Sequence, residues 1–409
     1  MTAVLTARPE PESVPRLAPV VAHEADADFV ALLEASLREA GEQARSGLDP
    51  ALFAALPWPT TFREYLVFLV EFARWIPQES SDPAWSDPGT PEDQEVYDRL
   101  CHFYWLIDQP VGAGGQAVQD IEWFSDWLVG YADVWGEFLD TTESFNDQIL
   151  QTFLDDSPKY RVQDSLIDGR PNNPSGWLTF NQFFARELNP GLRPVAAPTT
   201  NLVATSPADC TYKAQYAIGA DSSIPQITIK GTHTYANVRD LLVGSRYADA
   251  FAGGYFIHFF LGPYSYHRFH TPVAGTVQEC FPVRGKVYLK VQLAQQQFQA
   301  YDASQGAYEF AQARGVLTVD TSGSPCGDVG VVGVVPVGMC QVSGVNMTHV
   351  TGTECLKGDE FGYFTFGGSD IIVLFQAGTQ PQYNPAFQQD PPPYSLYGTE
   401  IATLTALTG

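Results

Sequence analysis

The sequence predicts an α+β protein: a helical N-terminal domain followed by a β-rich barrel or sandwich domain. Residues 1–158 carry 29 acidic residues, 7 Arg and no Lys, a net charge of −22, whereas residues 159–409 carry 18 acidic and 15 basic residues, a net charge of −3. All eight tryptophans lie at or before Trp177. The apolar pattern also changes from helical spacing to strand-like alternation beyond Pro190. These contrasts predict three parts: a disordered arm over 1–25, an acidic helical domain over 26–176 and a second domain over 177–409.

Helical periodicity defines the first domain. Phe29, Leu33, Leu37 and Ala40 fall on one face of an expected helix. The predicted helices cover residues 26–46, 61–76, 90–107 and 116–154, the last broken near Gly130 or Gly136. A capping-box pattern of Thr179 and Gln182 then predicts a short helix over 180–187.

Short alternating runs separated by Gly and Pro define the second domain. Tyr212, Ala214 and Tyr216 alternate with polar residues, for example. The predicted strands lie near residues 202–204, 212–218, 227–229, 254–261, 273–281, 286–293, 315–320, 328–346 and 371–376. Residues 376–393 are rich in Gln and Pro and predict a surface loop, and the PPPY at 391–394 fits either a polyproline turn or a WW-domain ligand.

Composition excludes several classes of function. The net charge of −25 argues against binding to nucleic acid or to an anionic membrane through a basic patch. The most apolar stretch, 329–338, is too short to span a bilayer. The N-terminus lacks the apolar core of a signal peptide, and the six cysteines show no C-x-x-C spacing. The sequence therefore predicts a cytoplasmic protein with free thiols and no transmembrane segment.

Three segments could together carry chemistry: SPAD at 206–209, YHRFHTP at 266–272 and FTFGGSD at 364–370. They supply an acid, a base and a hydroxyl. A serine needs a base to take its proton, and a carboxylate orients that base. Each segment alone also fits a purely structural role: the first and third segments could be turns, and the histidines of the second could be structural. Zinc binding by the two histidines is disfavoured because further ligands at suitable spacing are not evident, so no metal is predicted.

In combination and order, the segments resemble the phosphatidylserine decarboxylase superfamily of self-processing, pyruvoyl-dependent enzymes. That superfamily carries S-P-x-D-G, Y-H-R-x-H-x-P and L-G-S-T or F-G-G-S segments. Here they read SPADC, YHRFHTP and FGGSD, supported by FNQFFARELNPGLRPV, KGTHTYANVRDLL and KGDEFGYFTFGGS. The resemblance covers about residues 178–376. The long acidic N-terminal region is similar to that of the soluble branch typified by the fungal tryptophan decarboxylase of psilocybin biosynthesis.

The resemblance implies self-cleavage between Gly368 and Ser369. Ser369 Oγ would attack the Gly368 carbonyl to give an ester, and elimination and hydrolysis would leave a pyruvoyl group on Ser369 as the cofactor. The products would be a β chain, residues 1–368, and an α chain, residues 369–409, which remain partners. His267 or His270 would be the base, oriented by Asp209. We assign processing to His270 and protonation of the decarboxylated product to His267.

Two further residues and two departures from the family pattern complete these expectations. Tyr266 and Phe269, beside the histidines, are candidate substrate-binding residues, with core packing as the alternative. Cys210 replaces the usual glycine after the motif aspartate, and Asp370 replaces the usual Ser or Thr after the serine. A carboxylate at 370 would either slow processing or contact an amine-bearing substrate.

Three functions remain open from the sequence. The leading one is decarboxylation of a free L-amino acid to its amine, with an aromatic, tryptophan-like substrate favoured. The alternative is a phosphatidylserine decarboxylase that makes phosphatidylethanolamine, although no basic or amphipathic membrane anchor is visible. A third interpretation is a β-rich binding protein that keeps the motifs without cleaving itself.

Overall fold

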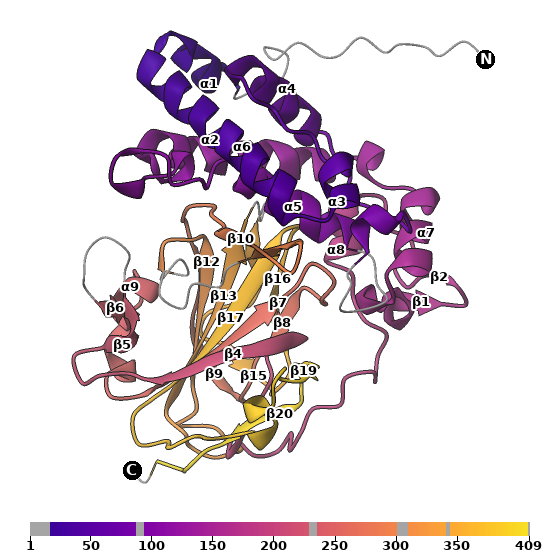
Figure 1. The fold of residues 1–409 in the computed structure, drawn as a ribbon. Coiled ribbons are helices and arrows are strands. Elements are labelled where there is room, and N and C mark those ends of the chain that lie inside the picture. The colour runs from indigo at the N-terminus through magenta and orange to yellow at the C-terminus, as the bar shows by residue number, and fades with distance from the viewer. Residues whose placement is uncertain (1–16, 87–93, 229–234, 301–309, 341–343, 408–409) are drawn as a thin grey trace.

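A helical layer packs against one end of a curled β-sheet in the computed structural model of the protein (Figure 1). The structure describes residues 17–86, 94–228, 235–300, 310–340 and 344–407. Within these ranges the N-terminal part is helical and the C-terminal part is built from strands, which confirms the predicted α+β class. One large core of buried hydrophobic residues runs from the helical layer into the sheet.

The helices follow the apolar periodicity closely. They are α1 Ala18–Ala22, α2 Ala27–Gly47, α3 Pro50–Ala55, α4 Phe62–Phe72, α5 Glu95–Trp105, α6 Glu122–Leu139, α7 Asp147–Asp156, α8 Phe180–Phe184 and, among the strands, α9 Val238–Leu241. Polar side chains start several of them: Asp26 accepts hydrogen bonds from Asp28 N and Phe29 N at the start of α2. Thr179 accepts one from Gln182 N at α8, as its capping pattern predicts.

One helix prediction and part of the predicted disordered arm need correction. The predicted break near Gly130 or Gly136 is wrong, because α6 runs through both glycines and ends at Leu139. The helix contacts around these positions outweigh the roughly 1 kcal/mol propensity cost of a glycine. The actual break precedes α7, which Asn146 caps. Residues 1–16 of the predicted arm lie outside the described residues, whereas residues 18–25 are helical.

The strands are β1 Leu166–Ile167, β2 Arg170–Pro171, β3 Val203–Thr205, β4 Cys210–Ala217, β5 Ser223–Thr228, β6 Tyr235–Asn237, β7 Tyr255–Leu261, β8 Arg268–His270, β9 Gly275–Val283, β10 Val291–Ala294, β11 Gln297–Ala300, β12 Arg314–Asp320, β13 Val331–Met339, β14 Val345–Met347, β15 Glu354–Cys355, β16 Glu360–Phe364, β17 Gly368–Phe375, β18 Gln382–Tyr383, β19 Tyr394–Ser395 and β20 Glu400–Thr403. Eight of them form an antiparallel sheet in the order β15-β9-β12-β13-β17-β7-β4-β19.

The strand predicted over 286–293 is shifted, because only its end belongs to β10. The predicted loop before residue 394 contains β18 and a short 3₁₀ turn.

Strand β17 occupies the middle of the large sheet, between β13 and β7. Ser369 lies opposite Gly338 of β13 and Leu261 of β7, and no register shift interrupts either ladder. Successive side chains of a strand point to opposite faces. The sequence of β17 fits this position, because both faces are buried: Ile371 packs into the large core, whereas Ile372 packs into a second, smaller one.

No helix within the described ranges is both long enough and apolar enough to cross a membrane.

Candidate active site

The serine of the third motif, Ser369, lies at the start of the central strand β17, and its hydroxyl is buried. Ser369 is fully buried, and its Oγ makes no hydrogen bond to any described residue. Gly367 has a φ of 150°, a conformation that residues with a Cβ rarely adopt. A buried hydroxyl without a partner costs free energy. The segment therefore holds an unsatisfied buried hydroxyl two residues after a glycine in an unusual backbone conformation.

The helical layer holds the chain just before these glycines. Phe366 N donates a hydrogen bond of 2.9 Å to Asn181 Oδ1, at the start of α8. The Phe366 ring packs edge-on against Trp135 of α6 and against Phe184 of α8. Residues far apart in the sequence thus fix the position of the segment that leads to Ser369.

His267 sits beside the same aromatic cluster. Its ring stacks on Phe184, with centroids 3.8 Å apart, and its carbonyl accepts a hydrogen bond from Phe364 N. Burial, together with the nearby Arg186 guanidinium, holds the pKa of His267 well below its usual range. The ring is therefore neutral near pH 7 and can accept a proton.

His270 belongs to a neighbouring group. Its Nδ1 lies 2.9 Å from the Gly358 carbonyl, which can only accept, so Nδ1 carries the proton in the neutral ring. The Nε2 atom then accepts from the Tyr266 hydroxyl at 3.2 Å. The Tyr397 ring stacks on the imidazole at 3.8 Å. Burial lowers the pKa of His270 to about 4.

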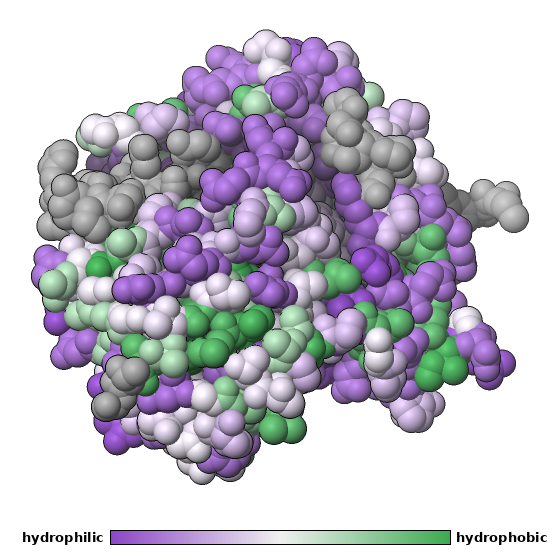
Figure 2. Space-filling view, turned by 90° about the horizontal axis from the view of Figure 1, so that it is seen from below, coloured by the Kyte–Doolittle hydropathy of each residue, from purple (hydrophilic) through white to green (hydrophobic). Residues whose placement is uncertain are grey.

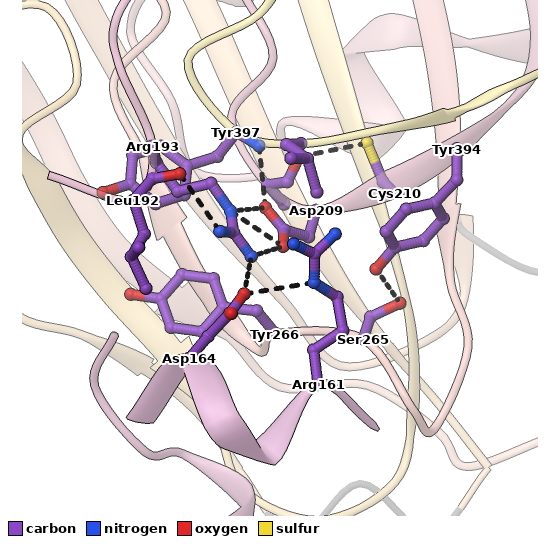
Figure 3. Close-up of polar contacts among 12 residues, drawn as sticks. Arg161, Asp164, Leu192, Arg193, Asp209, Cys210, Ser265, Tyr266, Tyr394 and Tyr397 are labelled. Atoms are coloured by element: carbon purple, nitrogen blue, oxygen red, sulfur yellow. Dashed lines mark hydrogen bonds and ion pairs between the residues drawn. The ribbon is translucent and has the colours of Figure 1, made fainter. Parts of the chain in front are cut away.

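Asp209 is buried and paired with an arginine (Figure 3). Arg193 Nη2 donates to Asp209 Oδ2 at 2.7 Å, and Nε lies 3.1 Å from both carboxylate oxygens. Tyr397 N donates to Oδ1 at 2.8 Å. The described structure shows no hydrogen bond from Asp209 to His267 or His270. The expected orienting contact is thus replaced by an indirect one, in which Tyr397 contacts Asp209 through its backbone and His270 through its ring.

Of the other residues that the sequence analysis names, some lie at this site and others are buried in the core. Tyr266 lies at the site, hydrogen-bonded to His270. Phe269 is fully buried and packs against Phe361 and Phe364. Cys210 is buried, and its Sγ donates to the Ala208 carbonyl at 3.3 Å, so the departure from glycine leaves the Asp209 turn closed by a side-chain contact. Asp370 lies 3.2 Å from His258.

Sequence reasoning missed three contributors. Arg193 lies within the quoted GLRPV segment, and its spacing to Asp209 gave no sign of their pairing. Tyr394 donates a hydrogen bond to Ser265 Oγ at 3.0 Å, and Tyr397 contacts Asp209 and His270. Both tyrosines follow the Pro-rich segment that suggested a surface loop. Only the pairing of β19 with β4 brings them to the motif aspartate.

A cavity of only about 10 Å³ is lined by site residues, including Asp209 and Tyr266, and two larger cavities are lined by their neighbours in the chain. One of about 220 Å³ is rich in aromatic rings and includes Tyr97, Tyr160, Phe260 and Tyr264 in its lining. Phe260 and Gly262 of this cavity flank Leu261, the cross-strand partner of Ser369. The second cavity, of about 360 Å³, is more polar and is lined by Asn181, Arg186, Arg268 and Tyr363, among others. Within the described residues, no group of three His, Cys, Asp or Glu side chains converges as a metal site.

The buried neutral histidines predict a stability that depends on pH. The folded-state pKa of His270, about 4, is below the usual 6.5, so between these values the unfolded chain binds more protons. The stabilisation is therefore complete above pH 6.5 and is lost as pH falls toward 4, by about 3 kcal/mol for this group. Urea unfolding of an uncut Ser369→Ala chain at pH 4.5 and 7 measures it. His270→Gln should reduce the pH dependence, and an unchanged pH dependence would contradict the assignment.

Comparison with known proteins identifies the class of this β-rich region. Residues 180–391 match the family model of phosphatidylserine decarboxylase. The chain belongs to the phosphatidylserine decarboxylase family, as the motifs predict.

Two of the individual relatives are named as phosphatidylserine decarboxylases, and a third is named only as a decarboxylase. Phosphatidylserine decarboxylase proenzyme 2 of Oryza sativa is 29% identical over 61% of this chain and 37% of its own length. Decarboxylase iboD of Amanita muscaria is 28% identical over 59% of this chain and 74% of its own. Phosphatidylserine decarboxylase proenzyme 3 of Schizosaccharomyces pombe is 34% identical over 49% of this chain and 19% of its own. The chain thus spans less than half the length of the rice and fission yeast phosphatidylserine decarboxylase proenzymes.

Proposed function

We propose that the protein is a self-processing, pyruvoyl-dependent decarboxylase that releases CO₂ from a free aromatic L-amino acid. The observation that supports it most is the buried, unpartnered Ser369 Oγ behind Gly367, in a chain of this family. Processing needs a base for the serine proton, and His270 is neutral, with the proton on Nδ1. Its Nε2 lone pair accepts from the Tyr266 hydroxyl and serves as the base when that hydrogen bond opens.

Self-cleavage uses groups of this chain and one water molecule. Ser369 Oγ loses its proton to His270 and attacks the Gly368 carbonyl carbon; the imidazolium then gives the proton to the Ser369 nitrogen as the peptide C–N bond breaks and an ester forms. Loss of the Ser369 α proton and of the Gly368 carboxylate leaves a dehydro residue. Water then releases ammonia and leaves a ketone at the new N-terminus of residues 369–409.

The pyruvoyl ketone supplies an electron sink for the breaking C–CO₂ bond of an amine-bearing substrate. His267 is assigned the proton transfers of turnover. Because its ring is neutral, it can take a proton from the substrate ammonium and return it to the α carbon after CO₂ leaves. The aromatic cluster around Phe184 and Phe366 excludes water from this step.

The aromatic substrate class is supported by the 220 Å³ cavity. Apolar cavities of about 150 Å³ bind benzene, so this one accommodates an aromatic ring. Phe260 of this lining lies opposite Asp370 in the ladder between β7 and β17, one residue along from the cross-strand partner of Ser369, so the cavity lies beside the start of β17. Lys159 in the same lining offers a positive charge to a substrate carboxylate, whereas burial raises the pKa of Glu79 well above its usual range and favours its neutral form.

Replacing Tyr264 tests this pocket. Tyr264→Ala should raise the KM for the amino acid about tenfold or more, because burial of an aromatic side chain contributes about 1.5–3 kcal/mol. The matched control is Tyr363→Ala, a tyrosine of the 360 Å³ cavity, which should leave the KM unchanged. The opposite pattern would place the substrate in the polar cavity and contradict the aromatic pocket.

A second candidate, decarboxylation of phosphatidylserine, is favoured by the names of the rice and fission yeast relatives. Seen from below, the surface is largely hydrophilic, with several separate hydrophobic patches (Figure 2). The net charge of −22 on residues 1–158 opposes docking on an anionic bilayer. Assays with tryptophan, tyrosine and phosphatidylserine liposomes in parallel separate the two. Sedimentation with the liposomes and phosphatidylethanolamine formation, without activity on free amino acids, would establish the second candidate.

A further inference from the structure

The residue after the candidate serine takes part in a buried contact between two strands. Asp370 is fully buried, and its Oδ2 lies 3.2 Å from Nε2 of His258, which is 4% exposed. Asp370 of β17 lies opposite Phe260 of β7, and His258 lies opposite Ile372. The two residues are therefore diagonal neighbours on one face of the sheet.

That face is not the one that carries the serine side chain. The ladders of β17 are regular, so Ser369 shares a face with Ile371 and Asp370 shares the other with Ile372. The cores on the two sides agree with this, since Ile371 and Ile372 belong to different clusters. The Asp370 carboxylate therefore points away from the Ser369 hydroxyl, which argues against a direct contact with the substrate amine.

The proposed cleavage would turn this contact into one between two separate chains. After cleavage, Asp370 is the second residue of the α chain, whereas His258 belongs to the β chain. The start of β17 then becomes a chain end without a covalent link to the residues before it, so that only the ladders to β13 and β7 and its buried side-chain contacts hold it in place. Other contacts of the α chain with the site, from Tyr394 and Tyr397, lie more than twenty residues further along.

We propose that Asp370 and His258 form an interchain clamp that holds the pyruvoyl-bearing N-terminus of the α chain in place. This inference rests on the proposed self-cleavage. The pair acts through the strand and touches no reacting atom, so both are positioning residues. A displacement of about 1 Å at a reacting group can reduce the rate about 100-fold, so fixing this chain end matters for turnover.

The test compares Asp370→Ala, Asp370→Asn and His258→Ala with the wild type. The matched control is Glu279→Gln, which alters another buried carboxylate of the same sheet, bound to Ser245 and the backbone of Arg246 within the β chain. Intact mass gives the extent of cleavage, and carbonyl titration gives the pyruvoyl content. We then measure kcat per pyruvoyl, KM, and the urea concentration that releases the α chain. Tryptophan fluorescence reports on the β chain, since all eight tryptophans lie in it.

The clamp predicts a specific pattern. Asp370→Ala and His258→Ala should lower kcat per pyruvoyl about 10- to 100-fold with little change in KM. They should also release the α chain in less urea, before the β chain unfolds. Asp370→Asn, which keeps the shape and one acceptor oxygen, should recover part of the loss, and Glu279→Gln should leave kcat unchanged.

Three results would overturn the clamp: wild-type kcat per pyruvoyl in the alanine variants, no partial recovery in Asp370→Asn, or an equal kcat loss in Glu279→Gln. If Asp370→Ala does not fold, the asparagine variant decides by the same measurements. A wild-type chain that stays uncut overturns the proposed function instead, and this is seen before any variant is made.

Discussion

Replacing Ser369 with alanine is expected to leave one uncut chain of 409 residues without decarboxylase activity. The hydroxyl is the only group at this position that can attack the Gly368 carbonyl, so its loss removes both the cleavage and the pyruvoyl group. Since Oγ has no hydrogen-bond partner among the described residues, removing it breaks no bond of the fold. The variant should therefore be as stable as an uncut wild type, or more so.

Denaturing gels and intact mass measure this outcome. The matched control is Ser36→Ala, a buried serine of α2 that donates to the Leu106 carbonyl. It should lose some stability and still be cut. Cleavage of the Ser369→Ala chain at 368–369, or decarboxylation by it at the wild-type rate, would refute the role of Ser369.

The histidine variants should separate processing from turnover. His270→Ala removes the base that we assign to Ser369, and cleavage should slow by about 100-fold or more. His267→Ala should still be cut yet fail to release CO₂. Single-turnover assays per titrated pyruvoyl, combined with the rate of chain cleavage after synthesis, distinguish the two effects. If both variants are cut and turn over like the wild type, the two histidines are structural.

Asp209→Asn is expected to process slowly, because Tyr397, whose ring stacks on His270, loses the carboxylate that accepts from its backbone, and it is also expected to lose stability. Asp209→Asn deprives the buried Arg193 of a carboxylate, and breaking a buried pair costs about 3–5 kcal/mol. Asp164 also contacts Arg193 at 3.1 Å and should offset part of this cost. Urea unfolding should first show the conditions under which Asp209→Asn is folded. Its rate of chain cleavage should then be compared with that of the wild type under those conditions.

Local sequence patterns were sufficient for most of the fold. The helices α2, α4 and α5 follow from apolar residues at helical spacing, and α8 from the Thr179 cap. The break after α6 was misplaced because glycine propensity is weak compared with burial of the helix on both sides. The shifted strand at β10 reflects the weak register information in a short hairpin.

The candidate site was predicted as a set of residues and not as a geometry. The motifs named Asp209, His267, His270 and Ser369, because their spacing within each segment is local. The pairing of Asp209 with Arg193 and the arrival of Tyr397 depend on contacts between distant segments, which no local pattern encodes. The face on which Asp370 lies became clear only with the register of β17.

The most direct test of the account is the intact mass of the purified wild-type protein. We expect two chains, residues 1–368 and residues 369–409, the second lighter by one ammonia than a serine-started peptide and reactive toward a carbonyl reagent. A single uncut chain, or a small chain that begins with an unmodified serine, would contradict a pyruvoyl enzyme and favour the binding-protein interpretation.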